Sequence, residues 1–173
     1  MNNGSSKYLY FTEGETEKKL VDLLKTDLQV IKPGKSKVFN IFEDRITPAL
    51  LANISPKTKI VLIFDTDVIK PNFDLYDFNF SKLKKSRMVI DIITIPQCRN
   101  FEEEMVYSMN IKKAGQLFAA ENDAKFKSTF LRMDNRFLRS KLEENSFDIT
   151  KLWSRNPNGV FSFIENQARK IKL

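Results

Sequence analysis

The 173-residue sequence contains no histidine, and this absence excludes several classes of enzyme. Ser-His-Asp and Cys-His catalysis, histidine-ligated metallohydrolase sites and most zinc modules all need an imidazole. The single cysteine, Cys98, can form neither an internal disulfide nor a zinc site alone, and we expect it to be a small, at least half-buried residue. Any chemistry must therefore use carboxylates, lysines, hydroxyls or bound cations.

Long apolar runs are also missing. The longest strongly apolar run, residues 60–64, is far too short to span a bilayer, and residues 1–10 lack the basic start and apolar centre of a signal peptide. Together with the cysteine usage, this predicts a cytoplasmic protein without a membrane partner. A hydrophobic content of 42%, with fifteen phenylalanines, favours one ordered domain.

What the sequence does contain is an excess of positive charge. The formal net charge is +7, which favours a polyanionic partner, either nucleic acid or an anionic surface. Charge alone does not choose between the two.

Alternating strand and helix patterns predict the fold of the first part of the chain. The β-prone segments are residues 7–12, 37–41, 59–64 and 87–96, and the helical patterns between them include 15–28 and 42–53, with Pro48 near the first turn of the second helix. A turn is expected at residues 31–37. This order is typical of βαβ units and predicts a mostly parallel sheet.

Beyond residue 100 the pattern becomes helical. Short helices are expected at 100–109, 111–123, 125–133, 135–145 and 158–172. We therefore predict an α/β fold with about four mostly parallel strands flanked by helices, a core over residues 1–110, and a helical C-terminal extension over residues 111–173 packed on the same domain.

Two acidic clusters follow strands of the predicted sheet. Glu13 and Glu17 come after the first strand, and Asp65 and Asp67 come after the third. The carboxyl ends of parallel strands share one edge of a sheet, and Asp-x-Asp in extended chain points both carboxylates to one side, which suits a hard cation. Alternatively, the glutamates are solvated acids at a helix start and the aspartates cap the next segment.

The motifs "YFTEGETEKKL" (10–20) and "VLIFDTD" (61–67) together resemble the Toprim domain of topoisomerases, bacterial primases and OLD-family nucleases. Glu13-Gly14 matches the Glu-Gly pair after the first strand, Asp65-Thr66-Asp67 matches the Asp-x-Asp, and Glu17 matches a second OLD-type glutamate. "PQCRNFEEEMV" (96–106) with the helical tail is more loosely similar to the small RloB-like Toprim proteins associated with defence against phage.

The resemblance implies a Rossmann-like fold and a role for each matched residue. Glu13, Asp65 and Asp67 would be catalytic, and with Glu17 they would hold Mg²⁺ or Mn²⁺ at a scissile phosphodiester. Gly14 would let the backbone turn tightly and approach a phosphate. We assign Glu15 to the surface or to helix capping.

A third acidic group, Glu102 to Glu104, follows the fourth strand. Only one or two of its three carboxylates can face inward on a helix, and we favour Glu103 as a further metal ligand. A solvated helix face explains the same residues. OLD-type sites also use a late lysine to stabilise phosphate charge, for which Lys113, Lys127 and Lys151 are all eligible.

Residues 124–141 carry six basic residues against one acid. On a single helix, an apolar stripe of Phe126, Phe130, Met133 and Phe137 would leave Arg132, Arg136 and Arg139 in a row that fits a phosphate backbone, with Lys125 and Lys127 nearby. An ordinary solvated face fits as well. Trp153 is expected to be a core anchor, with base stacking as the alternative.

These observations lead to a metal-dependent Toprim nuclease acting on DNA or RNA, in anti-phage defence. The alternative is a nucleic-acid-binding effector subunit that a separate ATPase or sensor chain activates. A primase-type nucleotidyl transferase is disfavoured, because no zinc-binding or template-handling region accompanies the predicted domain.

Overall fold

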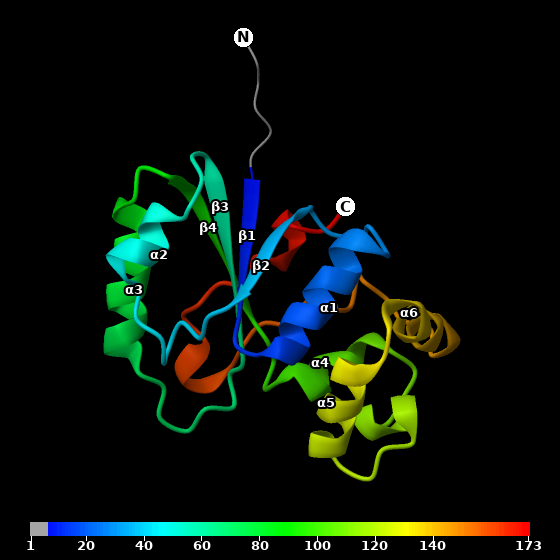
Figure 1. The fold of residues 1–173 in the computed structure, drawn as a ribbon. Helices are drawn as coiled ribbons and strands as arrows, with labels where there is room; N and C mark the ends of the chain where they lie inside the picture. Colours follow the sequence, from blue (N-terminus) through cyan, green and yellow to red (C-terminus); the bar gives the residue numbers. More distant parts are fainter. Residues whose placement is uncertain (1–6) are drawn as a thin grey trace.

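A four-stranded parallel sheet forms the centre of the computed structural model, which describes residues 7–173. The strands are β1 (Lys7–Thr12), β2 (Gly34–Val38), β3 (Thr58–Phe64) and β4 (Val89–Pro96), in the spatial order β2-β1-β3-β4. Every pair is parallel, and all the strands end at the lower edge in Figure 1. The α/β prediction, with its Rossmann-like parallel sheet, is thereby confirmed.

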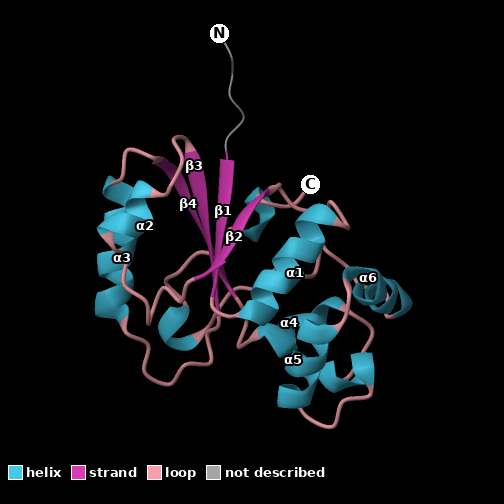
Figure 2. Cartoon of the chain, in the orientation of Figure 1, coloured by secondary structure: helices cyan, strands magenta, loops and turns pink. Residues whose placement is uncertain are grey.

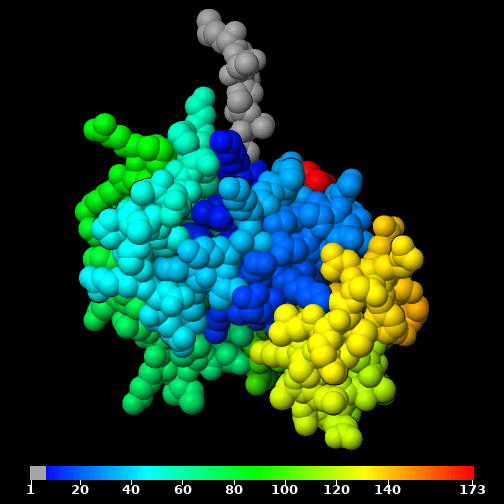
Figure 3. Space-filling model, in the orientation of Figure 1, coloured from blue at the N-terminus to red at the C-terminus, as the bar shows by residue number. Residues whose placement is uncertain are grey.

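Helices cover both faces of this sheet. They are α1 (Glu15–Thr26), α2 (Pro48–Ala52), α3 (Phe73–Lys85), α4 (Phe101–Ser108), α5 (Asp123–Arg132) and α6 (Asn135–Glu144), with short 3-10 turns at Ala114–Phe118, Gly159–Phe161 and Ala168–Lys170. Figure 2 shows α2 and α3 on one side of the sheet and α1, α4, α5 and α6 on the other. In Figure 3, α5 and α6 form a lobe beside α1.

The alternation of side chains along the strands builds two separate cores. Tyr10 and Val61 point to the face covered by α1 and α4, whereas Phe11 and Ile60 point to the face covered by α2 and α3. Successive residues of a strand face opposite sides, so a strand between two helical layers needs apolar residues at nearly every position. This explains the continuous apolar run of β3.

The C-terminal segment packs along the sheet instead of forming the predicted last helix. Residues 158–172 contain two 3-10 turns, and the Gln167 backbone N–H donates to the carbonyl of Thr94 in β4 at 2.8 Å. An antiparallel bridge joins Lys172 to Ile31, just before β2. The residues beyond 110 therefore share the core of α1 and β4, with Trp153 and Ile171 fully buried.

Three further expectations are wrong in detail. The helix expected over 111–123 is reduced to the 3-10 turn at Ala114–Phe118. The second strand begins at Gly34, inside the predicted turn, because Gly34 lies directly against Tyr8 of β1, where a Cβ would come within 2.4 Å of the Tyr8 carbonyl oxygen. The helix expected over 42–53 is confined to α2, with Thr47 as its N-cap and Pro48 in its first turn.

Residues 1–6, which belong to the predicted core and to the segment expected not to be a signal peptide, lie outside the described residues. Within residues 7–173, no helix combines the length and the apolar character that crossing a bilayer requires.

Candidate functional site

The ends of β1 and β3 bring Glu13 and Asp65 into direct contact. The two strands are hydrogen-bonded neighbours, and the Asp65 backbone N–H donates to Glu13 Oε2 at 2.9 Å. Asp65 is buried, with 8% of its surface exposed, and Glu13 is half-buried. The first two acidic clusters of the sequence therefore meet at the carboxyl edge of the sheet.

Glu17 joins them from the first turn of α1, where it is buried. The chain turns from β1 into α1 within two residues, Glu13 and Gly14, but Gly14 itself is extended, with φ −138° and ψ 176°, a conformation that any residue adopts. Its role is spatial, because a Cβ on Gly14 would lie 2.9 Å from Glu17 Oε2. Glu15 is exposed, as assigned. The absence of a side chain at position 14 therefore leaves space for the buried carboxylate of Glu17.

Burial and mutual repulsion raise the pKa values of all three carboxyl groups. Burial raises the pKa of Asp65 to about 9, with further contributions from the charges of Glu13 and Glu17. Burial is also the main cause of the raised pKa of Glu13 and of Glu17. The three groups therefore form one electrostatically coupled cluster that favours binding a proton or a cation.

Asp67 lies at the exposed outer side of this cluster. Its backbone N–H and that of Thr66 donate to the carbonyl of Arg99 at 3.1 and 2.7 Å, and the Asn100 side chain donates to Asp67 Oδ2 at 2.8 Å. These bonds fix the turn after β3 against the start of α4. Asp67 contributes to the raised pKa values of Asp65 and Glu13, which places its charge near both.

In α4, Glu102 rather than Glu103 faces the cluster. Glu102 is buried and its charge raises the pKa of Glu17, whereas Glu103 is half-exposed and lies 3.8 Å from Arg99. The preference for Glu103 as a metal ligand is therefore corrected. Phe101 and Met105 are fully buried and set the rotation of the helix, which turns Glu103 outward.

Lys127 is the late lysine that the fold brings to this site. It extends from α5, and its Nζ lies 3.0 Å from Glu102 Oε1. Burial acts to lower the pKa of Lys127, but the bond to Glu102, with the charges of Glu17 and Asp65, raises it. A fixed positive charge therefore lies among the carboxylates.

Lys113 and Lys151, the other two late lysines, are exposed. The charge of Lys127 contributes to the pKa shifts of Glu13 and Glu17, whereas the charges of Lys113 and Lys151 do not.

Three of the carboxylates in the cluster each have one oxygen bound to a protein donor in this conformation. Glu13 accepts from the Asp65 backbone, Asp65 Oδ1 accepts from Gln97 Nε2 at 2.5 Å, and Glu102 Oε1 pairs with Lys127. Across residues 7–173, no three acidic or cysteine side chains converge closely enough to form a ready-made set of metal ligands.

The chemistry of the cluster nevertheless fits a hard divalent cation. The atoms that could bind a metal here are all carboxylate oxygens, and the carboxylates outnumber the single nearby cation, Lys127. Glu102 Oε2 is also buried without a hydrogen-bond partner. Mg²⁺ or Mn²⁺ would compensate the repulsion that raises the pKa values. Binding would require some of these oxygens to leave their present donors.

A hollow of about 390 Å³ opens beside Glu13. Its lining comes from the loops after β2 and β3: Asn40, Phe42, Glu43, Val68, Lys70, Pro71 and Asn72, together with Glu13 itself. It gives the carboxyl edge an accessible volume next to the buried carboxylates.

The predicted arginine row does not form. The chain leaves the helical conformation at Met133, and the Asp134 side chain caps a new helix, so Arg132 ends α5 while Arg136 and Arg139 belong to α6. Arg139 Nε also pairs with Glu143 at 2.8 Å. Phe126 and Phe130 are buried as expected, but Phe137 is exposed.

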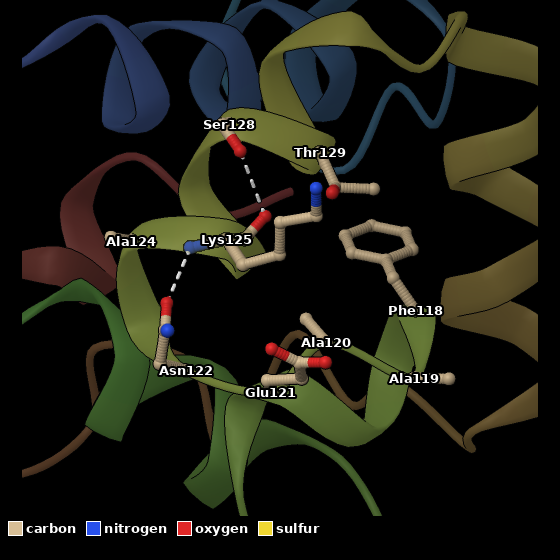
Figure 4. Close-up of a pocket in the computed structure, with 9 residues that line it drawn as sticks. All are labelled: Phe118, Ala119, Ala120, Glu121, Asn122, Ala124, Lys125, Ser128 and Thr129. Carbon is tan, nitrogen blue, oxygen red and sulfur yellow. Dashed lines mark hydrogen bonds between the residues drawn. The ribbon is translucent and has the colours of Figure 1, made fainter.

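Lys125 faces a different part of the surface from Lys127. It lines a hollow of about 500 Å³ with Phe118, Glu121, Ser128 and Thr129, shown in Figure 4, and no member of the acidic cluster lines this hollow. Lys125 and Lys127 are therefore close in sequence but lie on different parts of the surface.

Sequence reasoning missed Gln97, and it favoured Glu103 where the structure turns Glu102 towards the cluster. Gln97 directly follows β4, and its backbone N–H continues the ladder by donating to the carbonyl of Phe64 at 2.8 Å. Its position after a strand is the signal that would have placed it at the same edge as Asp65. Comparison with family models, curated proteins and solved structures yields no match to this chain.

Proposed function

We propose that the protein is a metal-dependent nuclease of Toprim type, which hydrolyses phosphodiester bonds of DNA or RNA in the cytoplasm as part of anti-phage defence. The observation that carries the proposal is the convergence of Glu13, Glu17 and Asp65 at the carboxyl edge of a parallel sheet, with Lys127 beside them. Buried carboxylates with raised pKa values at this edge are typical of a reactive site.

Glu13, Glu17, Asp65 and Asp67 would hold Mg²⁺ or Mn²⁺, with Glu102 as a further donor. A bound divalent ion supplies charge stabilisation to a phosphoryl group and lowers the pKa of water. Glu13 lies at the hollow, and its raised pKa suits a group that gives a proton to a leaving oxygen or takes one from water. Lys127 offers a positive charge to the phosphate.

Nucleic acid is the substrate that the surroundings favour. The chain carries a net charge of +7, which attracts a polyanion, and Lys70 offsets the charge of Glu43 in the lining of the hollow beside Glu13. The hollow reaches the half-buried Glu13 from the surface, which gives a phosphodiester within a long polymer a point of access.

The test is an assay of purified protein with Mg²⁺, Mn²⁺ or EDTA on single- and double-stranded DNA and RNA, with thermal melting in parallel. Metal-dependent cleavage, and a melting temperature that rises with metal, support the proposal. Asp65→Asn should remove both effects, while the exposed Asp74→Asn should remove neither. The proposal would be contradicted if neither metal changed the melting curve of the wild type and no nucleic acid were cleaved in the presence of either metal.

One observation favours the partner-dependent alternative. Glu13 Oε2 accepts from the Asp65 backbone and Glu102 Oε1 pairs with Lys127, so the described conformation resembles a resting site in which these two oxygens must leave their donors. A separate ATPase or sensor chain would then drive the change. Cleavage that appears only after addition of the product of a neighbouring gene would favour this alternative over an autonomous nuclease.

A further inference from the structure

A single side chain, Gln97, joins Trp153 to Asp65. The indole Nε1–H of Trp153 donates to Gln97 Oε1 at 3.1 Å, and Gln97 Nε2 donates to Asp65 Oδ1 at 2.5 Å. Trp153 and Gln97 are fully buried and Asp65 nearly so. A chain of hydrogen bonds therefore runs from the C-terminal part of the protein to the carboxyl edge of the sheet.

The direction of this chain follows from the chemistry of its first member. An indole N–H can only donate, so the amide of Gln97 must turn its oxygen towards Trp153. Its NH₂ group then faces Asp65, where it matches an acceptor. This arrangement fixes the amide, whose oxygen and nitrogen would otherwise be interchangeable. Asp65 thus meets a donor at Oδ1, and Oδ2 stays outside this bond.

Trp153 is itself held from several sides. Its backbone N–H donates to Glu104 Oε2 at 3.0 Å, its carbonyl accepts from the Asn166 side chain at 3.0 Å, and its φ of +54° is unusual for a bulky residue. Glu104 is fully buried and also binds Arg155 at 3.1 Å. A conformation fixed by so many bonds gives the indole one orientation.

We infer that Gln97 is a positioning residue for the metal site, which holds Asp65 in one orientation with Oδ2 available to a cation, and that Trp153 fixes Gln97 in this role. The inference rests on the proposed function, because it assumes that Asp65 binds a divalent ion. Outer partners that orient a ligand typically change metal affinity by about 10- to 100-fold when removed.

Trp153 is the only tryptophan of the chain, so its emission reports on this site alone. A cation at Asp65 changes the charge at the far end of the hydrogen-bonded chain. Mg²⁺ should therefore shift the emission of the wild type, although the indole itself is not a ligand.

The experiment measures Mn²⁺ affinity by titration calorimetry and by the electron paramagnetic resonance signal of free Mn²⁺, and Mg²⁺ binding by tryptophan emission. Gln97→Met keeps the length of the side chain without its hydrogen bonds. It should weaken Mn²⁺ binding by about 10-fold or more and uncouple the emission from Mg²⁺. Trp153→Phe keeps a buried ring and should weaken Mn²⁺ binding in the same direction; it serves alone if Gln97→Met does not fold.

Tyr10→Phe is the matched control, because it removes a hydrogen bond of a different buried side chain, from the Tyr10 hydroxyl to the Lys32 carbonyl at 2.5 Å. Its Mn²⁺ affinity should equal that of the wild type. Wild-type affinity in folded Gln97→Met, or in Trp153→Phe, would overturn the inference and leave the proposed function standing. A wild type that binds no Mn²⁺ would overturn both.

Discussion

Lys127 Nζ lies 3.0 Å from Glu102 Oε1 and joins α5 to α4 at the edge where the acidic strand ends meet. The positive charge of Lys127 relieves the repulsion between the carboxylates. Because the pair is only partly exposed, it is also a stronger ion pair than one on an open surface. The same charge would be available to a phosphate that enters beside Glu13.

Lys127→Met should therefore lower cleavage at saturating substrate by about 10²-fold, the scale on which a charge-stabilising group contributes. Lys85→Met is the control, because this residue is an exposed lysine in the last turn of α3, on the other face of the sheet. Its kcat should stay within about twofold of the wild type. Equal losses in the two variants would show that Lys127 has no special place in the site.

In EDTA, the wild type should lose stability as the pH rises. The pKa of Asp65 is raised to about 9 in the folded protein from 3.8, mainly by burial, so between these values the folded chain holds a proton that the unfolded chain releases. The unfolding free energy should fall by about 1 kcal/mol per pH unit across this window and level off above it. Urea unfolding at pH 5 to 9 measures the slope.

Asp65→Asn should flatten that slope, since the amide does not titrate, and Mg²⁺ should reduce it in the wild type by favouring the ionised cluster. Glu13 and Glu17 have pKa values shifted in the same direction and will leave a residual slope. A wild-type profile in EDTA that is flat or rises with pH would argue against a coupled buried cluster.

Glu13→Gln and Asp67→Asn should each lower the rate of cleavage by about 10²-fold or more while the protein stays folded, because both changes remove charge at nearly constant volume. If the two residues act through one metal centre, the double variant should lose about as much activity as the worse single variant. Rates are compared at equal metal concentration, with circular dichroism as the check on folding. Losses that multiply would point to independent roles.

Arg132, Arg136 and Arg139 remain predicted nucleic-acid contacts, now as separate residues on two helices. Each phosphate contact that is lost lowers the slope of log K against log salt by about 0.7 to 0.9. Arg132→Ala and Arg136→Ala should each show this change, and Arg139→Ala a smaller one because it pairs with Glu143. Salt-dependent binding titrations measure it, and unchanged slopes in all three would assign these arginines to a solvated face.

The meeting of Glu13 with Asp65 was predictable from the sequence, because both follow strands and parallel strands share one carboxyl edge. The choice between Glu102 and Glu103 was not, since it depends on how tertiary packing of Phe101 and Met105 rotates α4. The arginine row was not predictable from helical spacing either, because Asp134 caps a new helix inside the segment expected to form one continuous helix.

The role of Gln97 was hidden for another reason. The amide of Gln97 is neither charged nor nucleophilic, so no sequence motif distinguishes it. Its proposed role depends on the hydrogen bond to Trp153, which lies 56 residues further along the chain. Such a contact is visible only once the C-terminal segment has been placed against the sheet.

The bridge between Ile31 and Lys172 has a consequence for synthesis of the protein. A ribosome makes about 5 to 20 residues per second, so residues 7–31 wait on the order of ten seconds before their late partner emerges. Until then the apolar face of α1 lacks Trp153 and Ile171 as cover. The nascent chain therefore carries uncovered apolar surface during translation, and chaperone supply should influence its yield.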